Sequence, residues 1–454
     1  MGVSVSVDTI NKGVESLSTQ ARHTVRQFGK TKLVAYAYDN FDIDFKSNLP
    51  TIEKGTTRSH LTSGTLIRLE HGVTAEHLRC SEELWSQSLL NPTLDGRLSP
   101  PCTIHDFLAL HPEPPHLSGL TRNQRFNSWV LYRDLCQYGP QFFLDYQDTV
   151  GLPEVVEAIP VVKMVHIPAR AMDINQSKVS GNIQAIEELI QQGGVGDPEV
   201  DGSSVRESDV TDIREHVVLF HGDLGTGERV ESLLERRSLE KTVTNRFQFV
   251  IFVFGLFHFK MACADALWRI FIEPKLSRDD DNSLMRFVAQ HRPRETGKIG
   301  TKPGFRRMHE VIDHEGVALR LSAWQTELSK RNAAWTSLKL VAQSKPTPEY
   351  LKSVADHLAV NYVAGAGPNV RVDRMRRQPI KVRDQQRENM FLLHKYLLLY
   401  DQATHAMNHG DIGLLETTFP PWIAIFKATG KHKYATHIMK HLNDVHWRYP
   451  KDLR

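Results

Sequence analysis

The sequence predicts an α/β protein in which a mixed β-sheet core is interrupted by a large helical insertion. Strongly β-prone runs at residues 33–45, 217–220 and 247–256 alternate with segments of helical apolar spacing. From about residue 259 to 400 the spacing is helical, broken only by basic stretches that contain proline and glycine. With 454 residues, 40% of them hydrophobic, the chain is expected to hold more than one domain or one heavily inserted domain.

The first predicted elements are a helix, a strand and a hairpin. Residues 4–29 have apolar side chains at helical spacing, and Gly29 is suited to end that helix. The run at 33–45 alternates little between apolar and polar residues, which favours a central strand covered on both faces. Two β-prone pieces flank Ser63 and Gly64, and this pattern predicts a hairpin turn there.

The later elements are mostly helices. A helix is expected around Trp129, another at 177–194, and a third from about Thr226, after the β-prone run at 217–220 and a glycine-rich turn. The tail at 391–445 predicts three helices with a break near Pro420 and Pro421, because proline removes a backbone donor.

The composition excludes several classes of protein. No segment has the pattern of a secretory signal or is long and apolar enough to cross a bilayer, so an intracellular protein without a membrane span is expected. The cysteines are too widely spaced for a zinc motif, which favours buried thiols in a reducing compartment. The HGDLGTGER segment has Glu228 where a P-loop needs lysine, and Val230 where a dinucleotide fingerprint needs glycine.

Two stretches of the chain are strongly basic, although the formal net charge is only +3. Residues 286–307 contain seven Lys or Arg residues and one acid, and residues 371–387 contain seven and two. Solvated faces explain each stretch alone, whereas two of them in one region favour a polyanionic partner. The predicted nucleic-acid-binding residues are Arg292, Arg294, Lys298, Lys302, Arg306, Arg307, Arg374, Arg376, Arg377, Lys381 and Arg383.

Two aspartates follow β-prone runs and are the first candidates for a metal site. Asp39 comes after the first strand-like run, and Asp223 comes after the run at 217–220. Carboxylates at the ends of neighbouring strands converge at one sheet edge, where their oxygens suit hard divalent cations. The local alternatives are a turn role with Asn40 for Asp39, and a turn acid before Gly225 for Asp223.

Four segments carry a resemblance to a known family. They are YDNFDIDF, HGDLGTGERV, FGLFHFKMACADAL and NHGDIGLLETTFPPWIAIFKATGKHKY. They resemble an uncharacterised fungal domain family of unknown function, which is itself similar to transposases of mobile elements with an RNase H-like fold and an Asp-Asp-Glu/Asp site. The resemblance extends over nearly the whole chain.

This resemblance implies a function and a set of residue roles. It implies an RNase H-like core, Mg²⁺ or Mn²⁺ as cofactor, and metal-dependent cleavage and strand transfer of duplex DNA, with a nuclear location and a homo-oligomer as compatible expectations. It gives Asp39 as the first catalytic metal ligand, Asp223 as the second and Glu416 as the third. The implied division is a leading helix at 1–30, the core at 31–258, a helical and partly basic insertion at 259–400, and C-terminal helices completing the core at 401–454.

Two departures from the family pattern leave other interpretations open. Only about thirty residues precede the first strand, so the upstream DNA-binding module of many transposases is not expected here. The third acid is also ambiguous, and the alternatives to Glu416 are Asp401, Asp411, Asp444 and His437. An inactive descendant that keeps the fold and DNA binding therefore remains an alternative, as does a partner-binding protein that needs no nucleic acid.

Overall fold

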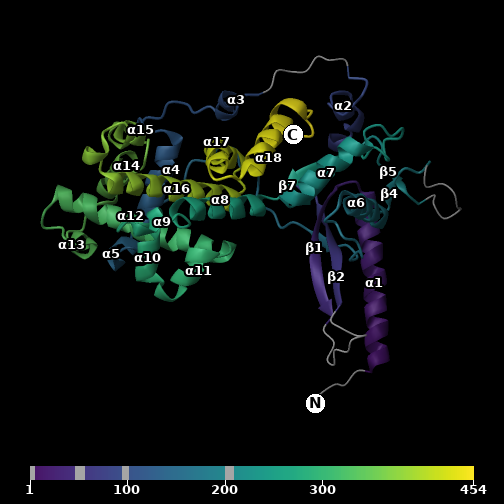
Figure 1. Ribbon diagram of the computed structural model, residues 1–454, viewed down its shortest axis with the longest axis horizontal. Coiled ribbons are helices and arrows are strands. Elements are labelled where there is room, and N and C mark those ends of the chain that lie inside the picture. Colours follow the sequence, from purple (N-terminus) through teal and green to yellow (C-terminus); the bar gives the residue numbers. More distant parts are fainter. Residues whose placement is uncertain (1–5, 46–56, 95–101, 200–208) are drawn as a thin grey trace. The chain divides into compact units, whose positions relative to one another are not determined.

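A computed structural model describes residues 6–45, 57–94, 102–199 and 209–454 of the chain. The chain forms two compact units (Figure 1). The first, here the sheet unit, comprises residues 1–101, 160–258 and 437–454, and the second, the helical unit, comprises 102–159 and 259–436. The chain therefore passes from one unit to the other four times, after residues 101, 159, 258 and 436. One of these passages coincides with the boundary expected at residue 259.

The sheet unit is built on a mixed five-stranded sheet with the order β3-β2-β1-β6-β7. This confirms the expected α/β class with a mixed sheet. Strand β1 pairs antiparallel with β2 and parallel with β6, while β6 pairs parallel with β7. The strands are β1 (Val34–Phe45), β2 (Thr57–Arg68), β3 (His166–Pro168), β6 (Val218–Gly222) and β7 (Val250–Phe254).

Apolar residues cover both faces of the central strands, which explains why β1 does not alternate in polarity. On one face, Tyr36 and Phe220 are buried and stacked with ring centroids 5.3 Å apart. On the other face, Val217 and Ile251 are buried in a second apolar cluster. A strand covered on both sides needs apolar residues at consecutive positions.

Three helices pack around the first face of the sheet. They are α1 (Val7–Lys30), α6 (Val179–Gly193) and α7 (Leu224–Arg237). Figure 1 shows α1 alongside the β1–β2 pair, with α6 next to the C-terminal end of α1. There, a Cβ atom on Gly29 would collide with the backbone of Gly193, so the helices can approach this closely because residue 29 is glycine.

The hairpin predicted at Ser63 and Gly64 is wrong, because β2 runs without a break from Thr57 to Arg68. Gly64 lies opposite Tyr38 in the middle of the strand pair. A Cβ atom on Gly64 would come within 2.5 Å of Leu189 Cδ2 on α6. The glycine therefore makes room for a helix above the sheet and does not form a turn.

Shorter elements complete the sheet unit. They are η1 (Ala75–Leu78), α2 (Ser81–Ser86), β4 (Val195–Gly196), β5 (Thr211–Asp212) and the π-helical turn η6 (Asp444–Arg448). Strands β4 and β5 pair in parallel as a separate small sheet, and residues 200–208 between them lie outside the described part of the chain.

The helical unit contains no strand in the part of the chain that the structure describes. This agrees with the helical spacing predicted from about residue 259. Its helices and the helices that cross into it are α3 (Ile104–Leu108), α4 (Arg122–Tyr138), α5 (Gln141–Leu144), η2 (Gln147–Thr149), α8 (Leu256–Phe271), α9 (Lys275–Asp279), α10 (Leu284–His291), η3 (Pro293–Glu295), α11 (Thr296–Thr301), α12 (Phe305–Arg331), α13 (Leu338–Gln343), α14 (Pro348–Asn361), η4 (Pro368–Val370), α15 (Val372–Arg376), η5 (Ile380–Val382), α16 (Gln385–His409), α17 (Ile412–Ala428) and α18 (His432–Asn443).

The tail forms the three helices predicted for it, but the break predicted at Pro420 is wrong. Helix α17 continues through both prolines from Ile412 to Ala428. Phe419 and Trp422, on either side of the prolines, are fully buried, and both pack edge-on against Phe259. Burial of these large rings offsets the loss of two backbone donors.

Two further expectations concern the membrane and the cysteines. Within the described residues, every helix is too short or too polar to pass through a bilayer. All four cysteines are free thiols; Cys80, Cys136 and Cys263 are buried, whereas Cys102 is half-buried. None of the four cysteines therefore forms a disulfide bond.

Candidate functional site

The two aspartates predicted as metal ligands line one cavity in the sheet unit. Strands β1 and β6 are parallel neighbours, with Ala37 paired to His221. Counting two residues onward on each strand puts Asp39 level with Asp223. Both aspartates lie on the wall of a cavity of about 260 Å³, at the point where the pairing of β1 with β6 ends.

The surroundings of Asp39 differ from the expectation in one respect. Asp39 does not end its strand, because β1 continues to Phe45 in register with β2. Its side chain is exposed, and its Oδ1 atom accepts a hydrogen bond of 2.8 Å from the backbone N–H of Asn40. The local role considered with Asn40 is thus present, and it uses only one carboxylate oxygen.

Asp223 combines a structural role with a place on the cavity wall. It is the N-cap of α7, and its Oδ1 atom accepts a hydrogen bond of 2.7 Å from the backbone N–H of Thr226. A carboxylate at this position satisfies an otherwise unpaired N–H group and opposes the positive end of the helix dipole. Among the described residues, neither Asp39 nor Asp223 has an ion-pair partner.

The cavity also contains side chains that the sequence reasoning missed or left ambiguous. Ser63 and Thr65 reach it from β2, and His221 and His258 come from the ends of β6 and the start of α8. Burial lowers the pKa of His221, so this imidazole is neutral near pH 7. The register of β1 with β2 places Ser63 opposite Asp39. The sequence did not indicate this pairing, because a hairpin turn was predicted at Ser63.

The next two acids on β1 are bound to residues of the neighbouring strand. Asp42 forms ion pairs with Arg58 and His60, and Asp44 lies 3.9 Å from Arg58. Hydrogen bonds from Arg58 and then His60 lower the pKa of Asp42. These contacts give Asp42 and Asp44 partners on the neighbouring strand.

Glu416, the predicted third ligand, belongs to the helical unit. It is 5% exposed on α17, and its Oε2 atom lies 2.7 Å from Nε2 of His111. His111 is also nearly buried, and its Nδ1 atom lies 4.0 Å from a carboxylate oxygen of Glu157. Because Asp39 and Asp223 belong to the other unit, a site that joins all three acids stays a prediction.

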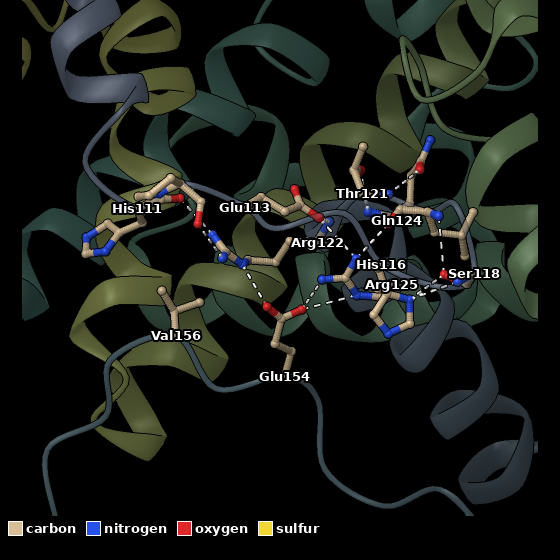
Figure 2. A network of polar contacts seen from close by, with 12 residues as sticks. His111, Glu113, His116, Ser118, Thr121, Arg122, Gln124, Arg125, Glu154 and Val156 are labelled. Atoms are coloured by element: carbon tan, nitrogen blue, oxygen red, sulfur yellow. Dashed lines mark hydrogen bonds and ion pairs between the residues drawn. The ribbon is translucent and has the colours of Figure 1, made fainter.

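A network of ion pairs holds the loop that carries His111 (Figure 2). Arg122, at the start of α4, donates 3.0 Å to the backbone carbonyl of His111 and pairs with Glu154 at 3.2 Å. Arg125 pairs with Glu113 and with the same Glu154 carboxylate. Burial raises the pKa of Glu154, but the hydrogen bonds from the two arginines outweigh it and lower the pKa overall.

The alternatives to Glu416 have local partners. Asp401 pairs with Arg133 at 3.1 Å, and Asp444 pairs with Arg448 at 3.0 Å. Asp411 is buried, caps α17, and accepts hydrogen bonds of 2.9 Å from the backbone N–H groups of residues 156 and 157. His437 lies 3.9 Å from Glu231 in the sheet unit. Each contact gives these residues a structural reason to be present.

Part of the first basic stretch is neutralised within the helical unit. Arg292 pairs with Glu295 and Glu310, Arg306 pairs with Glu310, and Arg307 lies 3.8 Å from Glu295. Arg286 lies 3.6 Å from Asp281. The remaining three cations of this stretch are exposed and have no ion-pair partner within the described ranges; they are Arg294, Lys298 and Lys302.

The second basic stretch shows the same division. Arg383 pairs with the buried Glu388 at 2.5 Å, and Arg376 lies 3.6 Å from the same carboxylate. Hydrogen bonding from Arg383 lowers the pKa of Glu388. Arg374, Arg377 and Lys381 are exposed, and the described part of the chain offers them no ion-pair partner.

Comparison with known proteins gives one match. Residues 98–454 match the model of a family of unknown function, DUF6589. Asp223 and Glu416 lie inside the matched region, whereas Asp39 and the YDNFDIDF segment precede it. No curated protein and no solved structure matches the chain. Because the matched region covers more than three quarters of its length, the chain belongs to the DUF6589 family of unknown function.

Proposed function

We propose that the protein is a transposase-derived DNA-processing enzyme that cuts and joins DNA strands with the help of a divalent cation held by Asp39 and Asp223. One observation carries the proposal. Two carboxylates occupy level positions on neighbouring parallel strands, line the same cavity and have no ion-pair partner among the described residues. Two like charges beside one cavity destabilise each other unless a cation lies between them.

The chemistry of the donors fits a hard cation. The cavity offers two carboxylates and the hydroxyl groups of Ser63 and Thr65, and oxygen is the ligand that Mg²⁺ and Mn²⁺ prefer. One oxygen of each aspartate is already a hydrogen-bond acceptor, which orients the carboxylate and leaves its second oxygen for a metal. When bound, such a cation would activate an attacking oxygen and stabilise the leaving one.

The arrangement of the sheet unit supports the RNase H-like relationship. The order predicted from the sequence is a strand ending in Asp39, a hairpin, a helix, a strand ending in Asp223, a helix and a strand, followed by a long helical insert and helices that bear acids. In the sheet unit the main elements follow the order β1, β2, β3, α6, β6, α7, β7, with β2 and β3 in place of the hairpin and with η1, α2, β4 and β5 in addition. The helical insertions of the proposed core are then residues 102–159 and 259–436.

The exposed cations of the two basic stretches support DNA as the partner. Six of the eleven predicted cations are exposed without an ion-pair partner in the described ranges: Arg294, Lys298, Lys302, Arg374, Arg377 and Lys381. Cations that no internal acid neutralises are available for phosphate groups, so we propose these six as the DNA-binding set. The five others have ion pairs that bound DNA would have to break.

A second candidate function has its own support. The residues that line the Asp39 cavity include no third carboxylate, and Glu416 is engaged by His111. A descendant that binds DNA through the exposed cations without cutting it is consistent with both facts. A partner-binding protein that needs no nucleic acid is the third alternative.

The test is cleavage of supercoiled and linear duplex DNA by the full chain in Mg²⁺ or Mn²⁺. We expect Asp39→Asn and Asp223→Asn to abolish cleavage while DNA binding persists, since asparagine keeps the N-cap of α7 and removes only the charge. Asp42→Asn is the matched control, because Asp42 lies on the same strand, pairs with Arg58 and His60, and does not line the cavity. Glu416→Gln tests the third position.

The outcomes separate the three candidates. Cleavage lost in both cavity variants and kept in Asp42→Asn supports the enzyme. Binding without cleavage in the unaltered protein supports the inactive descendant. Binding should weaken steeply as salt rises, because each phosphate contact releases counterions. A protein that binds no duplex DNA even at low salt is neither of these, and the third alternative then holds.

A further inference from the structure

The N-terminal half of α1 carries an apolar stripe that the described residues of its own chain leave exposed. Val7, Ile10, Val14 and Leu17 are 71%, 54%, 60% and 66% exposed. They recur at intervals of three and four residues, which places them on one face of the helix. Scattered exposed apolar residues are ordinary on a protein surface, but four in one continuous row indicate a contact surface.

The stripe follows a heptad pattern. Val7 and Val14 occupy the first position of successive heptads, and Ile10 and Leu17 occupy the fourth. β-Branched residues at the first position with leucine at the fourth favour a pair of helices wound together, and Val7, Val14 and Leu17 follow this rule, whereas Ile10 at a fourth position does not. The pattern is thus that of a seam between helices rather than that of a helix lying on a sheet.

The other half of α1 is already committed to its own unit. Val25 and Gly29 are buried against the sheet unit, and Arg26 and Lys30 form ion pairs with Asp209. The helix is therefore anchored at its C-terminal end, while its first three turns extend the same seam into solvent. An anchored helix loses less freedom when it binds a partner than a free segment does.

The residues that flank the stripe carry no charge. The positions that flank a coiled-coil seam are occupied by Ser6, Asn11, Gly13, Ser18 and Gln20, none of which is charged. Flanking charges help to choose the partner of a coiled coil through salt bridges, so a flank without charges neither requires a partner of opposite charge nor repels a second copy. An uncharged flank is the arrangement that allows a helix to pair with its own copy.

A second copy also matches the stripe in shape. In a parallel pair each of the four residues meets itself. In an antiparallel pair Val7 meets Leu17 and Ile10 meets Val14, because both pairs are centred on the same point of the helix, residue 12. No apolar residue is left without an apolar partner in either orientation, as a two-fold contact requires.

We propose that residues 7–20 of α1 form a two-helix coiled coil with the same segment of a second copy of this chain, making the protein a homodimer. The seam is only about two heptads long, so the dimer is reversible and its population depends on protein concentration. This inference does not depend on the metal site or on DNA binding.

A membrane surface is the main competing occupant of an amphipathic helix. Helices that lie on membranes have polar faces rich in lysine and arginine. In the exposed half of α1 the polar face carries Asp8, Lys12 and Glu15, which sum to one negative charge. Repulsion by anionic lipids makes this face a poor membrane anchor.

The test is sedimentation equilibrium of the full chain over a wide range of concentrations. We expect a monomer–dimer equilibrium that Ile10→Lys and Leu17→Lys each weaken by about tenfold or more, as loss of one buried aliphatic contact predicts. Thr19→Lys is the matched control, because it adds the same charge on the opposite face of the helix and should leave the dimer intact. Circular dichroism checks that all variants remain folded.

Three results would overturn the proposal. The first is an unaltered chain that stays monomeric at every concentration. The second is equal weakening by Thr19→Lys, which would mean that net charge and not the stripe controls association. The third is binding of the monomer to vesicles of phosphatidylcholine and phosphatidylserine that Leu17→Lys abolishes, which would assign the stripe to a membrane.

Discussion

A buried aspartate of the helical unit and two aspartates of the sheet unit have opposite surroundings. In the helical unit, the fully buried Asp134 on α4 lies 2.5 Å from Arg320 on α12 and 2.8 Å from Arg133, and Arg133 also reaches Asp401 on α16. In the sheet unit, Asp39 and Asp223 share a cavity wall and have no ion-pair partner among the described residues. Similar carboxylates are thus neutralised internally in one unit and left for the surroundings in the other.

This difference separates a structural acid from a candidate functional one. A buried carboxylate is tolerated only with a partner, and Asp134 and Asp401 connect three helices through their ion pairs with Arg133 and Arg320. An acid that lines an open cavity keeps its charge available for a cation. The comparison predicts that neutralising the first kind damages stability, whereas neutralising the second kind damages function.

The largest effect is expected at the buried pair. Asp134→Asn would leave the guanidinium of Arg320 buried and partly unpaired, and we expect the free energy of unfolding to fall by about 3–5 kcal/mol. Thermal or denaturant unfolding measures this loss, and Asp148→Asn, on an exposed aspartate, is the control. The double variant Asp134→Asn/Arg320→Gln should lose less than the sum of the two single changes. Strict additivity would contradict the pairing.

A smaller effect is expected from the buried His394 of the helical unit. Burial, with a further contribution from Arg320, lowers the pKa of this imidazole to about 4 from its usual 6.5. Between these values the unfolded chain binds a proton that the folded chain does not, so the free energy of unfolding falls as the pH falls from 6.5 to 4. A pKa difference of this size corresponds to about 3 kcal/mol.

Denaturant unfolding at several pH values tests the role of His394. His394→Leu should flatten the pH dependence in this window, whereas a variant of an exposed histidine, such as His314→Gln, should not. An unchanged slope in His394→Leu would show that other groups cause the acid sensitivity.

The smallest of the three effects tests the other side of the comparison. Without metal, Asp39→Asn should change the free energy of unfolding by no more than about 0.5 kcal/mol, since the side chain is exposed and unpaired. In Mn²⁺ at about a hundred times its dissociation constant, the unaltered protein should gain about 2.7 kcal/mol, and Asp39→Asn should lose that gain. Melting temperatures with and without Mn²⁺ measure both, with Asp42→Asn as control. Equal metal stabilisation of all three proteins would place the cation elsewhere.

Several features of the fold could be predicted from local sequence alone. The apolar run of β1, the helical spacing of α1 and α6, and the positions of Asp39 and Asp223 after the apolar runs of β1 and β6 can each be predicted from a few neighbouring residues. Asp223 is predictable in both of its roles, because an aspartate between a strand and a glycine-rich turn is suited to cap the next helix. Local patterns succeed wherever the conformation that they favour is also the one that buries their apolar side.

Other features depend on residues far apart in the chain. The local pattern around Gly64 predicts a turn, but this glycine makes room for Leu189 on α6. Pro420 predicts a helix break, but α17 continues because its aromatic residues pack against Phe259. Glu416 meets His111 across 305 residues of sequence. No local pattern contains such pairs, because the partner is chosen by packing and not by spacing.

The local sequence is enough to predict most of the helices and strands, their order, and the candidates Asp39 and Asp223 after two apolar runs. The level positions of Asp39 and Asp223, the pairing of Ser63 with Asp39, and the choice of arginines that form internal ion pairs depend on how the strands and helices pack. The physical reason is one of magnitude. Local preferences of ordinary residues for helix or strand amount to less than about 1 kcal/mol each, whereas burying one large apolar side chain contributes about 1.5–3 kcal/mol, so packing prevails where the two disagree.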